Sequence, residues 1–223
     1  MNILVTGCKG YIGSVLTDEL KKKGYSIKGL DTNYFSDCLL YDHDEDYEFV
    51  KKDIRDLNKD DLHDIDAVIH LAALSNDPLG EFNSKLTEEI NLRSTIKLAK
   101  LSKDSNVKRF IYISSQSMYG ISDTEEELDE ENSTKNPITA YAKTKWEAEC
   151  FLKEYSSENF SIVCFRPSTV FGASPRLRCD IVFNNFVACA YTTGLIEIKS
   201  DGTPWRPVIH IKDVCKAIIA GLI

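Results

Sequence analysis

The stretch ITAYAKTKWEAE, residues 138–149, places a tyrosine four residues before a lysine in a segment with a helical pattern. At that spacing Tyr141 and Lys145 lie on one face of a helix, one turn apart. A lysine ammonium beside a phenol favours the phenolate, so the pair could exchange a proton with a substrate hydroxyl group. Tyrosine and lysine are common residues, however, and the spacing alone is more typical of an ordinary helix surface.

A glycine-rich loop near the amino terminus is the strongest candidate for a binding element. In ILVTGCKGYIG, Gly7, Gly10 and Gly13 directly follow a predicted strand and open a predicted helix. Gly7 permits a tight turn, Gly10 lets the backbone approach a pyrophosphate, and Gly13 lets the helix pack closely on the sheet. The free backbone N–H groups at the helix start, at Tyr11 and Ile12, then face an anion. The loop therefore predicts a dinucleotide site.

Asp31 ends the second predicted strand, 18 positions after Gly13. A carboxylate at this place accepts hydrogen bonds from ribose hydroxyl groups and repels a 2′-phosphate, which favours NAD over NADP. An ordinary carboxylate at a strand end would look the same in the sequence. The glycine-rich loop that precedes Asp31 favours the cofactor role.

The elements that must position these residues alternate between short β-branched runs and helical patterns. Such alternation predicts an α/β fold with a parallel sheet covered by helices on both faces. The apolar runs DAVIHLAA and RFIYIS are typical of buried parallel strands. Strands are predicted at Ile3–Thr6, Ser26–Asp31, Glu48–Lys51, Ala67–Leu71, Arg109–Ser114 and Ile162–Phe165, and helices at Ile12–Lys23, Leu57–His63, Ser84–Asp104 and Thr139–Tyr155.

Composition limits the class of partner. The 223 residues carry a formal charge of −8, which argues against nucleic acid or an anionic membrane, because both require a basic face. No apolar run reaches the roughly 18 residues of a membrane helix, and the start MNILVTG lacks the pattern of a signal peptide. The seven cysteines are scattered without C-x-x-C spacing, which predicts reduced thiols in a cytoplasm and no metal site.

Several motifs occur together, in order, along the whole chain. Together they resemble the extended short-chain dehydrogenase/reductase family and, within it, the nucleotide-sugar epimerase/dehydratase branch. This resemblance implies a Rossmann-type doubly wound sheet and favours the catalytic interpretation of Tyr141 and Lys145. The motifs are TGCKGYIG (6–13), HLAA (70–73), SSQSMYG (114–120), YAKTK (141–145), RPSTVFG (166–172) and GTPWRPVIHIKDV (202–214).

The resemblance implies a reaction in which Tyr141 removes a proton from a sugar hydroxyl while hydride leaves the same carbon for the nicotinamide of NAD. A free phenol has a pKa of about 10, so the ammonium of Lys145 and the positive nicotinamide are needed to favour the phenolate. Lys145 is also expected to hold the nicotinamide ribose. Ser115 matches the family's hydroxyl residue that hydrogen-bonds the reacting oxygen.

Other positions match the family residue by residue. Arg206 matches an arginine that clamps the substrate diphosphate, a task suited to a planar and always charged guanidinium. Ser75, Asn76 and Asn185 are further substrate candidates, and Asn91 matches a helix asparagine that supports the site. The positions that the resemblance places at the cofactor are Gly7, Gly10, Tyr11, Ile12, Gly13, Asp31, Asp53, Ile54, Leu71, Ala72, Ala73, Asn91, Ser114, Tyr141, Lys145, Pro167, Ser168 and Val170.

Two positions depart from the dehydratase pattern. The 4,6-dehydratases of the family carry Asp-Glu directly after the catalytic hydroxyl residue, where this chain has Gln116 and Ser117. Neither side chain can act as a carboxyl acid or base, and Ser117 does not supply the glutamate of the decarboxylating members. The sequence therefore favours an NAD-dependent epimerase acting at C4 of a nucleoside-diphosphate hexose. A 4-dehydrogenase or 4-ketoreductase on the same substrates and a non-catalytic NAD-binding regulator remain as alternatives.

The resemblance also implies a domain division and an assembly. Residues 1–170 are expected to form the NAD-binding domain, and residues 171–223 part of a substrate-binding lobe interleaved with a return to the first domain. The chain stops at KAIIAGLI within an amphipathic helical pattern, tens of residues before family members end, so the lobe is expected to be truncated. Family dimers pair the helices that correspond to residues 84–104 and 139–155, which predicts a homodimer.

Overall fold

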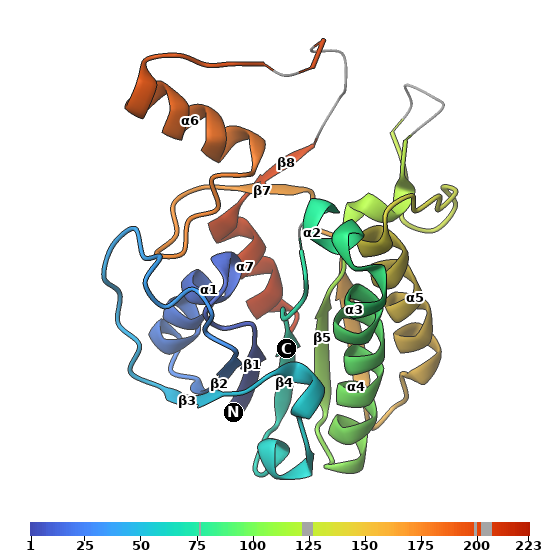
Figure 1. Cartoon of the computed structure of the whole chain (residues 1–223). Helices are drawn as coiled ribbons and strands as arrows, with labels where there is room; N and C mark the ends of the chain where they lie inside the picture. Colours follow the sequence, from blue (N-terminus) through green and yellow to red (C-terminus); the bar gives the residue numbers. More distant parts are fainter. Residues whose placement is uncertain (76, 122–126, 199, 202–206) are drawn as a thin grey trace.

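The computed structural model describes residues 1–75, 77–121, 127–198, 200–201 and 207–223. Its centre is a sheet of six parallel strands in the order β3-β2-β1-β4-β5-β6 (Figure 1). This order is that of the Rossmann fold, so the predicted doubly wound α/β class is confirmed. The strands are β1 (Asn2–Thr6), β2 (Ser26–Asp31), β3 (Glu48–Lys51), β4 (Ala67–His70), β5 (Arg109–Ile113) and β6 (Ser161–Phe165).

All six predicted strands are present, and their ends differ from the prediction by no more than one residue. The sequence reveals them because strands in the middle of a parallel sheet are apolar on both faces. In β1, Ile3 and Val5 belong to the core under one layer of helices, and Leu4 belongs to the core under the other. All three side chains are fully buried.

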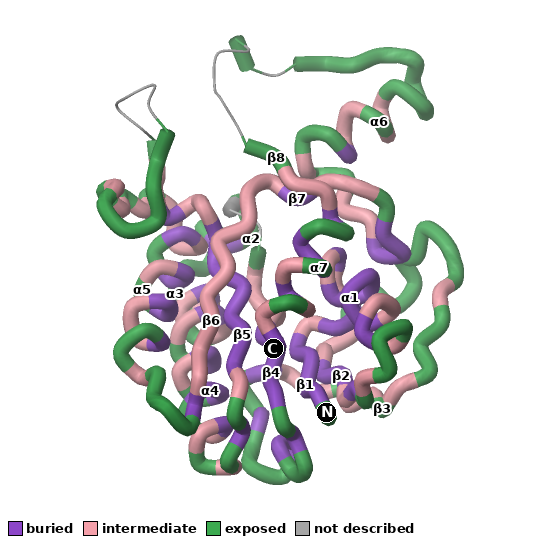
Figure 2. Tube along the Cα trace, turned by 180° about the vertical axis from the view of Figure 1, so that it is seen from behind, coloured by how far each residue is buried: buried purple, intermediate pink, exposed green. Residues whose placement is uncertain are grey.

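Helices cover both faces of this sheet (Figure 1). α1 (Tyr11–Lys22) and α7 (Ile211–Ala220) pack side by side on one face. α3 (Ser84–Glu88), α4 (Ser94–Asp104) and α5 (Ala140–Tyr155) lie on the other. Figure 2 shows that the central strands and the inner helix faces are buried.

A smaller group of elements lies beyond the carboxyl ends of the strands (Figure 1). β7 (Thr169–Phe171) pairs in parallel with β8 (Val208–His210), and α6 (Val182–Thr193) lies between them in the chain. Strands of three residues carry too little periodicity to be recognised in the sequence, and neither was predicted. α6 was also not predicted, and neither was the short helix α2 (Asp77–Phe82) beside α5.

The helix predicted at Leu57–His63 is present only as a short 3₁₀ helix, which is not α-helical and does not fill the predicted range. Two short 3₁₀ helices, η1 (Ile54–Asp56) and η2 (Lys59–Leu62), occupy this part of the chain. The Asn58 side chain accepts a hydrogen bond from the backbone N–H of Asp60 at 2.9 Å, and so begins a new helical turn there. A residue that caps a helix start in this way interrupts any longer helix that would run through it.

The two long predicted helices are present. Ser84–Asp104 is helical throughout, but a π-helical turn, η3 (Glu89–Arg93), separates α3 from α4. α5 begins at Ala140 because the hydroxyl of Thr139 accepts a hydrogen bond from the backbone N–H of Ala142 at 3.1 Å. This cap fixes the helix start directly before Tyr141.

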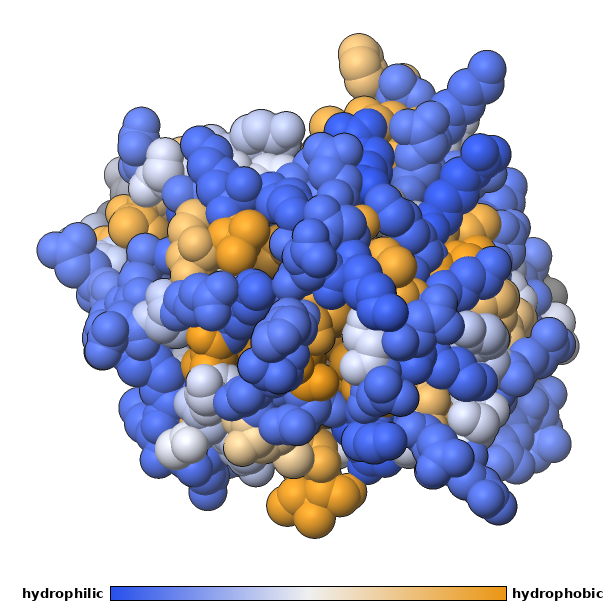
Figure 3. All heavy atoms as spheres, turned by 90° about the horizontal axis from the view of Figure 1, so that it is seen from below, coloured by the Kyte–Doolittle hydropathy of each residue, from blue (hydrophilic) through white to orange (hydrophobic). Residues whose placement is uncertain are grey.

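All seven cysteines are free thiols. Within the described ranges, no helix is both long and apolar enough to cross a membrane. Figure 3 views the molecule from the side of the amino ends of the strands, where apolar residues are scattered among a majority of polar ones. Ligands of doubly wound sheets bind at the opposite, carboxyl ends of the strands.

Candidate active site

The glycine-rich loop has the geometry of a close turn between β1 and α1. Gly7 has a φ of 75°, and a Cβ atom at this position would lie 2.7 Å from the backbone nitrogen of Ala72. A Cβ atom at Gly13 would overlap the carbonyl oxygen of Gly7. Only glycine therefore fits these two positions, which bring the helix start and the end of β4 against the loop.

The amino terminus of α1 is open to an anion. Gly10 occupies the cap position without a side-chain hydrogen bond, and the first turn contains no acidic residue. The first N–H groups of a helix lack partners within the helix and carry its positive dipole end. The turn at Tyr11 and Ile12 can therefore bind a phosphate through backbone groups alone.

Asp31 lies at the end of β2 and is held against this loop. Its carboxylate accepts hydrogen bonds from the backbone N–H of Lys9 at 3.1 Å and of Asn33 at 2.8 Å. The ammonium of Lys9 does not turn to Asp31 but pairs with Glu45 and lies 4.7 Å from the ring centre of Phe49. The carboxylate thus keeps a fixed place beside the loop.

Tyr141 and Lys145 lie together on the inner face of α5. The Lys145 ammonium is 5.9 Å from the ring centre of Tyr141 and 4.8 Å from that of Tyr112. It donates a hydrogen bond to the carbonyl oxygen of Ile113 at 2.7 Å, and only 4% of the residue is exposed. Burial lowers the pKa of Lys145 to about 7. Near neutral pH the amine therefore exists in both forms, and a nearby anion favours the charged one.

Two serines follow β5 at the same edge of the sheet. The Ser115 hydroxyl accepts a hydrogen bond from the backbone N–H of Ser117 at 3.1 Å and donates one to the Ser117 hydroxyl at 3.0 Å. It thereby caps a 3₁₀ helix, η4 (Gln116–Tyr119), which packs against α5. The buried hydroxyl of Ser114 has no hydrogen-bond partner in the part of the chain that the structure describes. An unpaired buried hydroxyl next to the proposed nicotinamide position fits a polar ligand.

Asn91 supports the site through the backbone. In the π-helical turn, its amide accepts a hydrogen bond from the N–H of Leu74 at 2.8 Å and donates to the carbonyl of Leu74 at 3.0 Å. Its amide nitrogen also lies 3.5 Å from the hydroxyl of Thr144 on α5. These hydrogen bonds hold Leu74 against the helical layer, and a contact of Asn91 with the cofactor stays a prediction.

A buried histidine joins the glycine-rich strand to α4. Nδ1 of His70 lies 2.7 Å from the hydroxyl of Thr6, and Nε2 lies 2.8 Å from the hydroxyl of Thr95. The Thr6 hydroxyl also accepts a hydrogen bond from the N–H of Ala72 at 3.4 Å. Burial lowers the pKa of His70 to about 3, so the ring stays neutral.

The remaining cofactor candidates lie at neighbouring strand ends. Asp53 follows β3 and is held by the guanidinium of Arg55 at 2.8 Å, which lowers the pKa of that carboxyl. Ile54 beside it is buried. The carbonyl of Pro167 accepts a hydrogen bond from the N–H of Gln116 at 3.4 Å, which ties Pro167, Ser168 and Val170 to the segment after β5.

The substrate candidates divide into three groups. Ser75 accepts a hydrogen bond from the Arg178 guanidinium at 3.1 Å, so it lies where the segment before α6 meets the end of β4. The amide of Asn185 donates to the carbonyl of Cys179 at 2.9 Å and stays within its own segment. Asn76 and Arg206 lie outside the residues that the structure describes.

Sequence reasoning missed Asn184, the neighbour of Asn185. Asn184 is buried, accepts a hydrogen bond from the N–H of Gly172 at 3.1 Å and donates one to the Tyr11 hydroxyl at 3.1 Å. The Tyr11 hydroxyl donates in turn to the carbonyl of Gly172 at 2.8 Å. The helical phase of α6 decides which asparagine faces inward, and this phase was not available without predicting α6.

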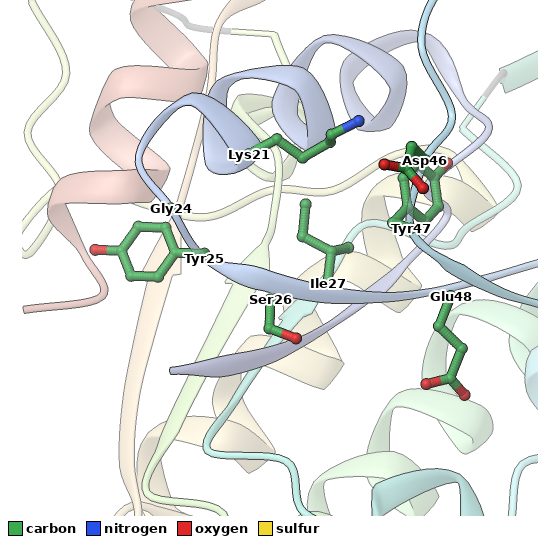
Figure 4. Close-up of a pocket in the computed structure, with 8 residues that line it drawn as sticks. All are labelled: Lys21, Gly24, Tyr25, Ser26, Ile27, Asp46, Tyr47 and Glu48. Atoms are coloured by element: carbon green, nitrogen blue, oxygen red, sulfur yellow. The ribbon is translucent and has the colours of Figure 1, made fainter.

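One hollow of the described surface lies away from these residues. It encloses about 400 Å³ at the amino ends of β2 and β3, at the opposite edge of the sheet (Figure 4). Its lining contains none of the candidate residues. It consists of Lys21, Gly24, Tyr25, Ser26, Ile27, Asp46, Tyr47 and Glu48.

Comparison with known proteins places this arrangement in a family. The sequence model described as "NAD dependent epimerase/dehydratase family" matches residues 3–222. The chain therefore belongs to this family, and the predicted resemblance is confirmed.

The chain is similar to curated proteins over nearly its whole length. It is 29% identical to the human dTDP-D-glucose 4,6-dehydratase, with 99% of this chain and 65% of the relative covered. It is also 29% identical to the UDP-glucuronate 4-epimerase of Thermodesulfobacterium geofontis, with 98% and 71% covered. The chain thus spans about two thirds of the length of such relatives.

A solved structure described as "MoeE5 in complex with UDP-glucose and NAD" superimposes on the chain with a TM-score of 0.84. The two are 27% identical, and the match covers 99% of this chain and 71% of MoeE5. Epimerases and dehydratases both occur among the relatives, so the family alone does not name the reaction.

Proposed function

We propose that this member of the family is an NAD-dependent nucleotide-sugar epimerase that acts at C4 of a nucleoside-diphosphate hexose. One observation carries the proposal. The buried ammonium of Lys145 lies 5.9 Å from the ring centre of Tyr141, directly beyond the end of β5 and at the edge where the glycine-rich loop opens. A phenol, a cation and a phosphate-binding loop at one edge are the groups that oxidation of a sugar hydroxyl requires.

The residues present fit NAD. The loop at Gly7 leaves no room for a Cβ atom, and the uncapped start of α1 offers N–H groups for the diphosphate. Asp31 would hold the adenosine ribose, Lys145 the nicotinamide ribose, and the unpaired Ser114 hydroxyl would face the nicotinamide side. When bound, NAD supplies a hydride acceptor that can later return the hydride to the sugar.

In this proposal Tyr141 takes the proton of the sugar hydroxyl as the carbon is oxidised, and gives it back when the hydride returns. The charged form of Lys145 favours the phenolate form of Tyr141, because the two groups are close and the ammonium is buried. The Ser115 hydroxyl would donate to the reacting oxygen after turning away from Ser117. The chain therefore provides a base, a cation and a donor around one hydroxyl group.

The segment after β5 favours epimerisation over dehydration. Elimination across C5 and C6 needs an acid for the leaving hydroxyl and a base for the C5 proton. The two positions that follow Ser115 are Gln116 and Ser117. The Ser117 hydroxyl accepts a hydrogen bond from the Ser115 hydroxyl. Neither residue can carry a proton as a carboxyl group does. The C6 hydroxyl of the sugar is therefore not expected to be eliminated.

Product analysis tests the proposal. The protein is incubated with NAD and a panel of nucleotide sugars, while NADH absorbance and the NMR spectrum of the sugar are followed. We expect a new C4 epimer without net NADH. Stoichiometric NADH with a ketosugar would instead identify a 4-dehydrogenase, and NAD binding without any turnover would identify a regulator.

A further inference from the structure

The connection between β7 and α6 crosses the glycine-rich loop and is fixed to it by buried contacts. The Tyr11 hydroxyl donates to the carbonyl of Gly172 at 2.8 Å. The Ser174 hydroxyl donates to the carbonyl of Tyr11 at 2.8 Å and lies 3.0 Å from the hydroxyl of Ser14. Ser174 is completely buried. The next residues of this connection are therefore held directly against the loop.

Arg176 is such a residue, and no carboxylate in the described part of the chain pairs with its guanidinium. It is 8% exposed, and its Nε donates to the carbonyl oxygen of Lys9 at 3.2 Å. Its Nη1 is buried without a hydrogen-bond partner, and among the described residues Arg176 forms no ion pair. The equally buried Arg166, by contrast, pairs with Glu149 at 2.6 Å.

An arginine in this state needs an anion. A guanidinium keeps its proton in proteins, so burial does not remove its charge. A buried cation without a counter-charge is costly to keep, whereas one beside a phosphate forms strong charge-assisted hydrogen bonds. Lys9, which Arg176 touches, lies between Gly7 and Gly10 in the turn that opens toward the uncapped start of α1. Both the turn and the guanidinium therefore attract the same kind of ligand.

We propose that Arg176 binds the diphosphate of the dinucleotide cofactor; this inference rests on the proposed use of NAD. A nucleotide sugar also carries a diphosphate, but the contact of Arg176 with Lys9 places it at the cofactor loop. Arg178, two residues later, turns instead to Ser75 and Asp180. The two arginines thus contact different segments at the carboxyl edge of the sheet, the glycine-rich loop and the segment after β4.

Titration calorimetry tests the assignment with ligands that differ in their phosphates. Wild-type protein, Arg176→Gln, Arg176→Lys and the exposed control Arg93→Gln are titrated with adenosine, ADP-ribose and UDP. We expect Arg176→Gln to lower the affinity for ADP-ribose roughly 10- to 100-fold. Arg176→Lys should lower it less, because lysine keeps the positive charge but not the planar guanidinium. Affinities for adenosine and UDP should stay within about twofold, and Arg93→Gln should match the wild type.

Other results overturn the assignment. Unchanged ADP-ribose affinity in Arg176→Gln would do so, as would a loss confined to UDP, which would move the arginine to the substrate diphosphate. An equal loss for adenosine would indicate a structural defect instead. If the wild type binds neither NAD nor ADP-ribose, the proposed function fails as well; if it binds both and the variants match it, only the role of Arg176 fails.

A second readout does not depend on the folding of Arg176→Gln. In nitrogen-15-labelled wild-type protein, the arginine Nε–H signal that Arg176→Lys removes should shift with ADP-ribose and stay in place with adenosine. A signal that remains fixed with ADP-ribose would contradict the proposal.

Discussion

The side-chain ammonium of Lys145 donates a hydrogen bond to the backbone carbonyl of Ile113 at 2.7 Å, and this bond links α5 to the end of β5. The same ammonium lies near the ring of Tyr141. The surrounding residues also bury the amine, and this burial lowers the pKa of Lys145 to about 7. One residue therefore contributes both to the position of the proposed catalytic helix and to the charge available to it.

The first prediction concerns stability and pH. In the unfolded chain Lys145 titrates at 10.5, and in the folded chain at about 7, so between these values the unfolded state binds more protons. Stability should therefore rise as pH increases from about 7, by about 2 kcal/mol up to pH ~9. Urea unfolding at a series of pH values measures this slope. In Lys145→Met the free energy of unfolding should lack this part of its increase with pH. The same slope in the variant and the wild type would contradict a lowered pKa of Lys145 in the folded protein.

The second prediction concerns turnover. Tyr141→Phe removes the oxygen that accepts the proton but keeps the ring, so turnover should fall by roughly 10²–10⁴-fold. NAD affinity should change little, because Lys145 and the glycine-rich loop remain. Steady-state kinetics and NAD titration check the two effects, with Tyr25→Phe at the far edge of the sheet as the control. Near-native turnover in Tyr141→Phe would rule out Tyr141 as the group that accepts the proton.

The third prediction concerns cofactor choice. NAD should bind more tightly than NADP, because Asp31 is fixed beside the loop by the N–H groups of Lys9 and Asn33. Asp31→Ala should weaken the binding of NAD and reduce the ratio of NAD affinity to NADP affinity by roughly 10-fold. Titration of both cofactors measures this, with the exposed Asp56→Ala as the control. A native preference for NADP would rule out the proposed role of Asp31.

The fourth prediction concerns acid stability. His70 titrates at 6.5 in the unfolded chain and at about 3 in the folded one. Below pH 6.5 His70 takes up a proton in the unfolded state but stays neutral in the folded state. The free energy of unfolding should therefore decrease as the pH falls, by about 2 kcal/mol at pH ~5. His70→Gln can keep hydrogen bonds to Thr6 and Thr95 without titrating, and should lose this part of the slope. The exposed His63→Gln should retain it.

The fifth prediction concerns assembly. If α4 and α5 pair with a second copy, the interface must use side chains left half-buried in one chain, such as Leu101, Phe151 and Tyr155, because Leu98 and Leu152 are already fully buried. Light scattering at micromolar concentration should then give a dimer. Phe151→Glu should give a folded monomer. A wild-type monomer would contradict the pairing.

The sequence was sufficient for the six-stranded sheet and for the close turn of the glycine-rich loop. Buried parallel strands are apolar on both faces, and the glycines of the loop are required by contacts that no other residue fits. The helix predicted at Leu57–His63 begins later than expected because the side chain of Asn58 caps a 3₁₀ helix that starts at Lys59. Local chemistry of this kind acts over two residues and disappears in a longer window.

The contacts of the loop with residues 172–184 could not be predicted, because they join distant parts of the chain. Arg176 is an unremarkable basic residue in the sequence, and only the fold places it against Lys9. Asn184 and Asn185 are identical in type and differ only in the face of α6 on which they lie. Burial of a polar group is a property of the tertiary structure, and sequence patterns weigh it poorly.

The hydrogen bonds of Tyr11 to Gly172 and Asn184 also order events during synthesis. They span 161 and 173 residues, so the first turn of α1 can form these hydrogen bonds only after residues 172 and 184 have left the ribosome. Contacts of such separation form late, because the entropy of closing the intervening loop must be overcome first. A nascent chain that ends before residue 172 can already pair β1 with β2 and β4, but its nucleotide loop remains unbraced. The glycine-rich loop is thus braced only after residues 172–184 are available, later than the pairing of β1 with its neighbours.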